Sequence, residues 1–347
     1  MFKKVPQIAS KENISKIKRL REQALSVDHL VDGIFKGDKT ALARAITLVE
    51  SSAQEHLQKA EAIIEKCLSK KSHSVRIGIT GVPGVGKSTF IEVFGKMLTE
   101  KGKKVAVLAV DPSSSLSKGS ILGDKTRMQT LARDPNAFIR PSPAGDSLGG
   151  VAQKTREAMI LCEAAGHDII LVETVGVGQS ETAVHGMVDF FLLLKLAGSG
   201  DELQGIKRGI IEMADAIVIN KADGPNEKQA NWAKTEFTRA LHLYPPKKNE
   251  WTPKVLTCSA TENKGILEIW QLIKDFVALT KQNGSFVDNR VRQRKNWFLQ
   301  GVDEHLKRQF YSGQSSKSLL KKYLSMVEKG KMAPSHAIRK LFAEYRQ

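Results

Sequence analysis

The sequence predicts an α/β fold in which a mostly parallel sheet is flanked by helices, between a helical N-terminal extension and a helical C-terminal arm. Three observations support this prediction. Short apolar runs recur along the middle of the chain and are continuous instead of alternating, as in strands buried on both faces. Helical patterns separate these runs. The composition changes on either side of them, which gives the predicted regions 1–73, 74–283 and 284–347.

The N-terminal extension contains the first strong helical pattern. Residues 1–36 are polar and basic with scattered apolar positions, which is consistent with one or two short helices. From Asp38, a good helix N-cap residue, apolar side chains recur every three or four positions as far as Leu68. This spacing predicts one long amphipathic helix that ends before the basic segment Lys70–His73.

A glycine-rich segment follows the first apolar run of the central region. The run Val75–Thr80 is followed by G-x-x-x-x-G-K-S and then by a helical pattern. This is a P-loop: its glycines let consecutive backbone N–H groups face one anion, Lys87 reaches the terminal phosphates, and the Ser88 hydroxyl ligates Mg²⁺. The helix that follows adds its positive end. The predicted phosphate-binding residues are Gly81, Val82, Pro83, Gly84, Val85, Gly86, Lys87, Ser88 and Thr89.

Two further apolar runs end in acidic residues. Lys104–Val110 leads to Asp111, and Asp168–Val172 leads to Glu173. The carboxyl ends of parallel strands share one edge of the sheet, where ligands bind, so both acids are expected beside the P-loop. Glu173 with Gly176 three residues on has the Walker-B and switch II arrangement, although most GTPases have Asp at the first position. We expect the glutamate to hold Mg²⁺ through water and the glycine N–H to contact the γ-phosphate.

The identity of the base is predicted from a later strand. The run 216–219 is followed by N-K-A-D, an N-K-x-D sequence that selects guanine. The carboxylate of Asp223 can accept both the N1–H and the exocyclic N2–H of guanine, a donor pair that adenine lacks. The first two residues of the motif brace the loop and the ring, and a last strand at 253–256 leads into an S-A-type loop. The predicted base-binding residues are Asn220, Lys221, Asp223, Ser259 and Ala260. The motifs together predict a P-loop GTPase.

The C-terminal arm is basic and helical. An apolar residue recurs every four positions from Phe298 to Phe310, and two more helical patterns cover Leu319–Val327 and Pro334–Tyr345. Residues 281–347 hold fifteen Lys or Arg against five Asp or Glu. Two interpretations stay open: the arm folds back on the nucleotide domain, or it serves dimerisation or partner binding, which we favour.

Composition limits the partners and the location. The 347-residue chain is 26% charged and 41% apolar, with a formal net charge of +17. That charge is compatible with nucleic acid, an acidic membrane surface or an acidic protein, and does not by itself choose among them. Cys67, Cys162 and Cys258 stand far apart, which argues against a disulfide framework or a zinc site and predicts three small buried side chains. With no run of about 18 apolar residues and no secretory h-region, we expect no membrane span and a cytoplasmic location.

Several segments together resemble a known family. In order between the two helical regions stand G-V-P-G-V-G-K-S-T, A-V-D-P-S-S-S, G-D-K-T-R-M, I-L-V-E-T-V-G-V-G-Q-S-E, L-A-G-S-G-D-E-L-Q-G-I-K and N-K-A-D. They resemble the MeaB/ArgK G proteins, the chaperones of adenosylcobalamin-dependent methylmalonyl-CoA mutase. The P-loop and N-K-A-D indicate only a GTPase, whereas the fourth and fifth segments are much more specific.

The resemblance implies roles for further residues. Asp111, Asp124 and Glu173 would be switch carboxylates around Mg²⁺ and the attacking water. The loop from Leu196 to Lys207 would be a third switch that couples the nucleotide state to the mutase, with Lys207 a nucleotide-dependent contact. A homodimer through the C-terminal arm is implied, with adenosylcobalamin reached only through the partner mutase and a cobalamin adenosyltransferase as a second candidate partner. The catalytic residues would be Lys87, Asp111, Asp124, Glu173 and Gly176, and the metal ligands Ser88, Asp111, Asp124 and Glu173.

We expect slow intrinsic hydrolysis, because Gln179 lies three residues beyond Gly176 and need not point inward. A partner would then order the switches. Three alternatives make other demands. A nickel-type metal-delivery GTPase would need a His or Cys tract, an RNA- or membrane-associated targeting GTPase would show steeply salt-dependent binding, and a kinase would need a second substrate pocket. The sequence does not favour nucleic acid as the partner.

Overall fold

The computed structural model describes residues 26–51, 53–110, 128–141, 148–174, 180–198 and 208–345. The chain divides into two compact units, the first ending at Arg290 and the second beginning at Val291. The predicted N-terminal extension therefore falls in the same unit as the predicted nucleotide domain. The predicted region boundaries themselves stay predictions.

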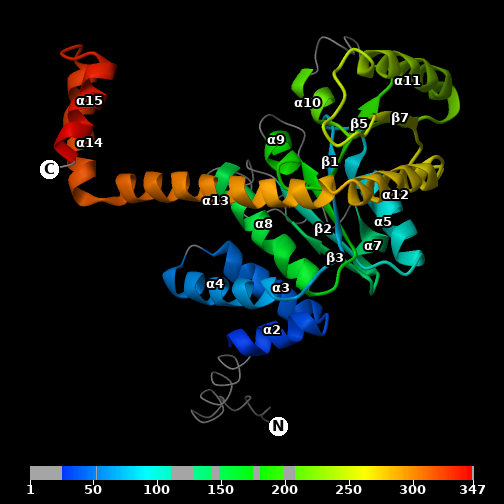
Figure 1. Cartoon of the computed structure of the whole chain (residues 1–347), viewed down its shortest axis with the longest axis horizontal. Helices are drawn as coiled ribbons and strands as arrows, with labels where there is room; N and C mark the ends of the chain where they lie inside the picture. The colour runs from blue at the N-terminus through cyan, green and yellow to red at the C-terminus, as the bar shows by residue number, and fades with distance from the viewer. Residues whose placement is uncertain are drawn as a thin grey trace, which may run out of the picture. The chain divides into compact units, whose positions relative to one another are not determined.

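A single parallel sheet organises the first unit (Figure 1). In the described part of the chain it has seven strands in the order β3-β2-β4-β1-β5-β6-β7, and every neighbouring pair is parallel. The α/β prediction is thus confirmed, with strand β1 of the P-loop at the centre. The strands are β1 (Val75–Thr80), β2 (Val105–Val110), β3 (Ala137–Arg140), β4 (Ile169–Thr174), β5 (Phe190–Leu196), β6 (Ala216–Asn220) and β7 (Lys254–Thr257).

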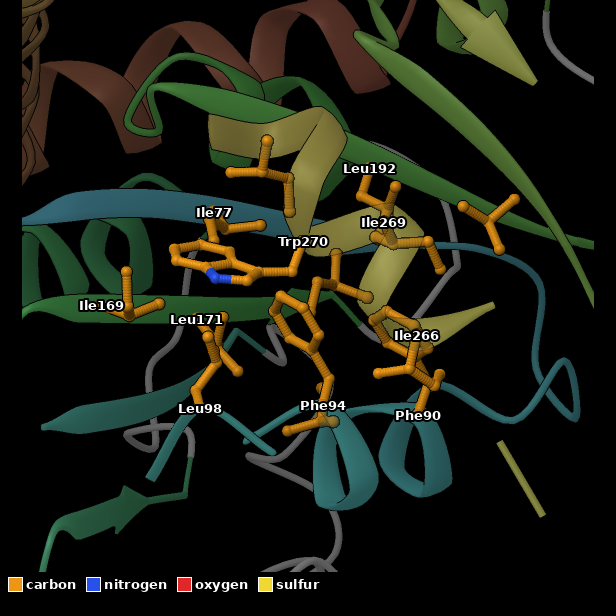
Figure 2. Packing of buried hydrophobic residues seen from close by; sticks show 14 of the residues in the cluster. Ile77, Phe90, Phe94, Leu98, Ile169, Leu171, Leu192, Ile266, Ile269 and Trp270 are labelled. Atoms are coloured by element: carbon orange, nitrogen blue, oxygen red, sulfur yellow. The ribbon is translucent and has the colours of Figure 1, made fainter. Parts of the chain in front are cut away.

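Helices α5 (Lys87–Glu100), α7 (Gln129–Arg133) and α12 (Ile266–Gln282) contribute to the main core on one face of the sheet. Phe90 and Phe94 stack in α5 with their ring centroids 5.3 Å apart, and Phe94 meets the edge of Trp270 from α12 at 6.2 Å. Figure 2 shows these rings between the two helices and the strand side chains. Burial of such large apolar side chains is the main stabilising contribution on this face.

The opposite face is covered by helices that the chain adds after β3. Figure 1 shows α8 (Leu148–Ala164) across the sheet from α5 and α12. Helix α9 (Ser180–His185) contacts β1 and β4, while α10 (Arg208–Met213) and α11 (Glu227–Leu241) cover β5, β6 and β7. A short 3₁₀ turn, Gly224–Asn226, leads into α11. Both faces of the sheet are therefore buried, as the continuous apolar runs predict.

The N-terminal helices correct one prediction. Instead of one long helix, the chain forms α3 (Lys39–Glu50) and α4 (Gln54–Leu68), preceded by α2 (Val27–Phe35). Ser51 is extended, with ψ of 147°, and its hydroxyl accepts from the N–H of Ala53, so a local side-chain bond replaces a helical one. The apolar spacing continues across the break because α3 and α4 both pack against α8.

An aspartate precedes three of the strands, at the amino edge of the sheet. Each carboxylate accepts a hydrogen bond from a backbone N–H group of the neighbouring strand, or of the residue directly before that neighbouring strand. The donor and acceptor pairs are Lys104 N to Asp168 Oδ2 at 2.8 Å, Arg76 N to Asp189 Oδ2 at 2.8 Å, and Phe191 N to Asp215 Oδ2 at 2.9 Å. These contacts fix the amino ends of neighbouring strands to one another.

A cluster of buried ion pairs lies at the same edge, and we call it the amino-edge cluster: Arg76, Glu163, Asp189 and Arg290. Arg76 binds Glu163 with two nitrogens, at 2.9 and 2.8 Å. Arg290, near the start of α13 (Ser285–Ser312), donates to both oxygens of Asp189 at 2.8 and 2.6 Å and to the carbonyl of Ser74. Burial alone would raise the pKa of Glu163, but Arg76 holds that pKa below its usual range.

The second unit contains the rest of α13, with α14 (Gln314–Glu328) and α15 (Pro334–Tyr345), which confirms the three predicted helical patterns. Its small core is built on Tyr323, Ala337 and Leu341. Phe310 packs on the ring of Phe342 at 5.2 Å. Among the residues described, no helix is both long and apolar enough to span a bilayer.

Candidate nucleotide site

The P-loop lies between β1 and α5 at the carboxyl edge of the sheet. Gly81, Gly84 and Gly86 have φ of +151°, +80° and +95°, in the left-handed region that favours glycine. A Cβ on Gly81 would stand 2.5 Å from the carbonyl oxygen of Leu194, so this position has no room for a side chain. Helix α5 begins at Lys87, directly after the loop, so its positive end faces the place where a phosphate would bind.

Lys87 turns its ammonium group toward its own loop. Nζ donates to the carbonyl oxygens of Gly81, at 2.7 Å, and Val82, at 3.2 Å, and the side chain is buried. Burial lowers the pKa of Lys87, while the nearby carboxylates of Glu173 and Glu181 oppose that change. Because a phosphate oxygen is a stronger acceptor for an ammonium group than a carbonyl, a bound nucleotide can replace these contacts.

Ser88 and Glu173 meet at the edge shared by β1 and β4. The Ser88 hydroxyl donates to Glu173 Oε1 at 3.3 Å, and Glu173 pairs in register with Ile79 of β1. A hydroxyl and a carboxylate are hard oxygen ligands of the kind Mg²⁺ prefers, and Mg²⁺ takes its remaining ligands from water and phosphate. No group of three or more His, Cys, Asp or Glu that could hold a metal occurs among the described residues. The donor set fits a magnesium ion that arrives with a nucleotide.

The last residue of β6 and the first residue of the loop that follows it are both hydrogen-bonded to the P-loop. Asn220 Nδ2 donates to the carbonyl of Val85 at 2.8 Å, and Lys221 Nζ donates to that of Gly84 at 3.1 Å. A Cβ on Gly86 would stand 2.8 Å from Asn220 Nδ2, so the close approach of the two loops depends on that glycine. The predicted phosphate and base segments are therefore one connected structure.

The carboxylate predicted to recognise guanine is oriented by two hydroxyls from the loop after β7. Ser259 Oγ donates to Asp223 Oδ2 at 2.5 Å, and Thr261 Oγ1 donates to the same oxygen at 3.3 Å. Ala260 between them is buried. Sequence reasoning did not include Thr261; its place two residues after Ser259 in a loop already assigned to the base was the available signal.

Glu181 is a second residue that sequence reasoning missed. It stands in the first turn of α9, is only 3% exposed, and raises the pKa of Lys87 against the effect of burial. The available signal was its position as the last residue of the E-T-V-G-V-G-Q-S-E segment.

The described residues include the predicted P-loop, Ser88, Glu173 and the base loops, and bring them together along one edge. Val82, Pro83 and Gly84 are exposed at the tip of the P-loop, and Thr89 is exposed on α5. Asp111, Asp124, Gly176 and Lys207 lie outside the described residues. The predicted third switch is described only from Leu196 to Gly198.

The fold and the motifs along this edge define the chain as a P-loop GTPase. The comparisons with known proteins name the family. A family model described as "Methylmalonyl Co-A mutase-associated GTPase MeaB" matches residues 42–315, and the chain belongs to this family. The predicted resemblance is therefore confirmed.

Relatives match over most of their length. The chain is 46% identical over 306 residues to "GTPase ArgK" of Escherichia coli strain K12, which covers 88% of this chain and 92% of the relative. It is 46% identical over 321 residues to the mouse protein "Methylmalonic aciduria type A homolog, mitochondrial", covering 90% and 77% respectively. Among solved structures, the "LAO/AO transport system kinase" is 38% identical, with a TM-score of 0.75, and covers 94% of this chain and 99% of that one.

Proposed function

We propose that this GTPase is a chaperone of an adenosylcobalamin-dependent acyl-CoA mutase of the methylmalonyl-CoA mutase type, which gates loading of the cofactor and protects the mutase from inactivation. The observation that supports this most is the extent of the family match. The match begins within α3 and ends within α14. It therefore includes helices that precede the sheet domain in the sequence and helices that follow it, as well as the nucleotide motifs. A match limited to the GTPase motifs would not support an association with a mutase.

The residues of the site suggest how the nucleotide is held. Lys87 would exchange its bonds to two neutral carbonyls for bonds to phosphate oxygens, and Ser88 and Glu173 would hold Mg²⁺. When bound, Mg²⁺ neutralises charge on the phosphate oxygens. Asp223 accepts the two guanine N–H groups, with Ser259 and Thr261 fixing its orientation. The remaining switch groups in this proposal are Asp111, Asp124 and the backbone N–H of Gly176.

Hydrolysis is proposed to be slow in the isolated protein and faster with the mutase. Phosphoryl transfer requires a positioned water and neutralised charge, and a partner that orders the switches supplies both. The loop from Leu196 to Lys207 is proposed as the segment that reports the nucleotide state to the partner. It begins at the carboxyl end of β5, next to the P-loop strand.

The C-terminal arm is proposed to form a homodimer. Phe298, Val302 and Leu306 recur every four residues on α13 and are 72%, 40% and 57% exposed. Apolar side chains in such a row are typical of a helix face that a second chain covers. A cobalamin adenosyltransferase as second partner and a cytoplasmic location remain parts of the proposal.

GTP turnover measured with and without an adenosylcobalamin-dependent acyl-CoA mutase tests the proposal. We expect slow turnover alone, stimulation by the mutase, and transfer of adenosylcobalamin into apo-mutase that depends on the nucleotide. Asp223→Asn provides a matched control, because the mutase response should then follow XTP instead of GTP. Turnover that is already fast and unaffected by the mutase would contradict the proposal. A response to nickel, or to RNA or anionic vesicles with a steep salt dependence, would favour the alternative functions.

A further inference from the structure

The buried thiol of Cys258 occupies an unusual place in the nucleotide site. It lies in the loop after β7, one residue before Ser259, and is 2% exposed. Its backbone joins two segments, because Cys258 N donates to the carbonyl of Ile219 and its own carbonyl accepts from Ala222 N, both at 2.9 Å. These two backbone hydrogen bonds therefore lie on either side of Lys221 and of Asn220, the last residue of β6.

The side chain of Asn220 connects this thiol to the P-loop. Its Nδ2 donates to the carbonyl of Val85 at 2.8 Å, and its Oδ1 lies 3.3 Å from Cys258 Sγ. A carbonyl can only accept, so the amide nitrogen must face Val85 and the amide oxygen must face the sulfur. The contact is then an S–H donor to a buried oxygen.

We propose that Cys258 is a positioning residue for nucleotide binding: its S–H group fixes the Asn220 amide in the one orientation that joins the base loop to the P-loop. This rests on the assignment of the N-K-A-D loop to guanine. Burial, with a smaller contribution from Asp223, raises the pKa of Cys258 to about 12, so the thiol keeps its proton and remains a donor at neutral pH. The same protonation makes it a poor nucleophile.

Loss of the donor has a defined consequence. Asn220 Oδ1 becomes a buried acceptor without the thiol, and the amide can rotate away from Val85. The two loops are then less well ordered before the nucleotide binds. Part of the binding free energy is used to order them, so the nucleotide affinity falls. GDP and GTP should weaken by the same factor, because the thiol acts on the loop that both nucleotides use.

Three substitutions separate the donor from the packing. Cys258→Ser keeps a hydrogen-bond donor but reduces the volume, Cys258→Val keeps the volume but removes the donor, and Cys258→Ala removes both. We expect the Ala and Val variants to bind GDP and GTP about tenfold more weakly, and the Ser variant to bind within about threefold of the unmodified chain. Cys162→Ala, which removes another buried thiol far along the chain in α8, is the matched control and should leave both affinities unchanged.

The measurement is titration of GDP and GTP by calorimetry, with the thermal unfolding of each nucleotide-free variant recorded in parallel. Weak binding by Cys258→Ser, or unchanged binding by Cys258→Val, in variants that unfold cooperatively would overturn the proposal. Failure of the guanine assignment is visible separately, because Asp223→Asn would then keep its preference for GDP over XDP. If Cys258→Ala does not fold, the Ser and Val pair still decides the question.

Discussion

Buried cationic side chains have different partners at the two edges of the sheet. At the amino edge, Arg76 and Arg290 bind carboxylates directly, at 2.8 and 2.6 Å. At the carboxyl edge, Lys87 is buried as well, but its ammonium group donates to two neutral carbonyls of its own loop. An ammonium satisfied by carbonyls can exchange them for a more negative ligand, whereas an arginine paired with a carboxylate has less to gain. The amino edge is arranged for stability and the carboxyl edge for a ligand.

The largest effect is expected when a charge is removed from the amino-edge cluster. Arg290→Met leaves Asp189, whose side chain is 1% exposed, without its main counter-ion. We expect unfolding in urea to require about 3–5 kcal/mol less free energy, while nucleotide affinity stays the same in the folded protein. Arg294→Met, an exposed position on the same helix, should change stability by less than about 0.5 kcal/mol. If Arg290→Met lost nucleotide affinity without losing stability, the amino edge would serve ligand binding and not the stability of the fold.

The next largest effect is expected when the buried charge at the carboxyl edge is removed. Lys87→Ala should weaken GDP and GTP about a hundredfold, roughly 2.7 kcal/mol, because the phosphates lose a charge-assisted contact. The nucleotide-free protein should be as stable as before or more stable, since a buried ammonium held by neutral carbonyls is lost. Lys101→Ala, an exposed lysine that follows the same helix, is the control. Titration with a fluorescent nucleotide measures the affinity, and urea unfolding measures the stability. A large loss of stability in Lys87→Ala would show that the Lys87 ammonium group stabilises the fold.

The smallest of the three expected effects is a dependence of stability on pH. Asp134 lies before β3, near the amino edge. Its burial would raise its pKa, but hydrogen bonds from Lys96, the N–H of Asn136 and Thr99 lower the pKa to about 2 from an ordinary value of 3.8. A depressed pKa stabilises the fold above the ordinary value, and this contribution is lost as the pH falls through about 2. Between pH 4 and 2, the urea midpoint of the unmodified chain should therefore fall more than that of Asp134→Asn. Equal slopes would show that ionised Asp134 does not stabilise the fold.

The sequence predicted the carboxyl edge better than the amino edge. A P-loop and an N-K-x-D loop need fixed residue types at fixed spacing, so local pattern was enough to place Lys87, Ser88 and Asp223. The amino-edge cluster joins Arg76, Glu163 and Arg290, which are far apart in the chain, and no local spacing links them.

Two other features show where local pattern is insufficient. The break at Ser51 does not disturb the apolar spacing, because α3 and α4 pack on the same helix, so periodicity alone predicted one helix. The contact between Cys258 and Asn220 depends on the parallel pairing of β6 with β7. The thiol was predicted only to be small and buried, which all three cysteines are. Its donor role emerges once the two loops are placed side by side.

We infer that the carboxyl edge binds a guanine nucleotide through Asp223, and one measurement decides whether this claim holds. GDP and XDP are titrated into the unmodified chain and into Asp223→Asn. Because the xanthine C2 carbonyl suits an amide donor, the substitution should weaken GDP by at least about tenfold and reverse the preference in favour of XDP. A variant that still folds and still binds GDP as tightly as the unmodified chain, with no gain for XDP, would contradict the claim.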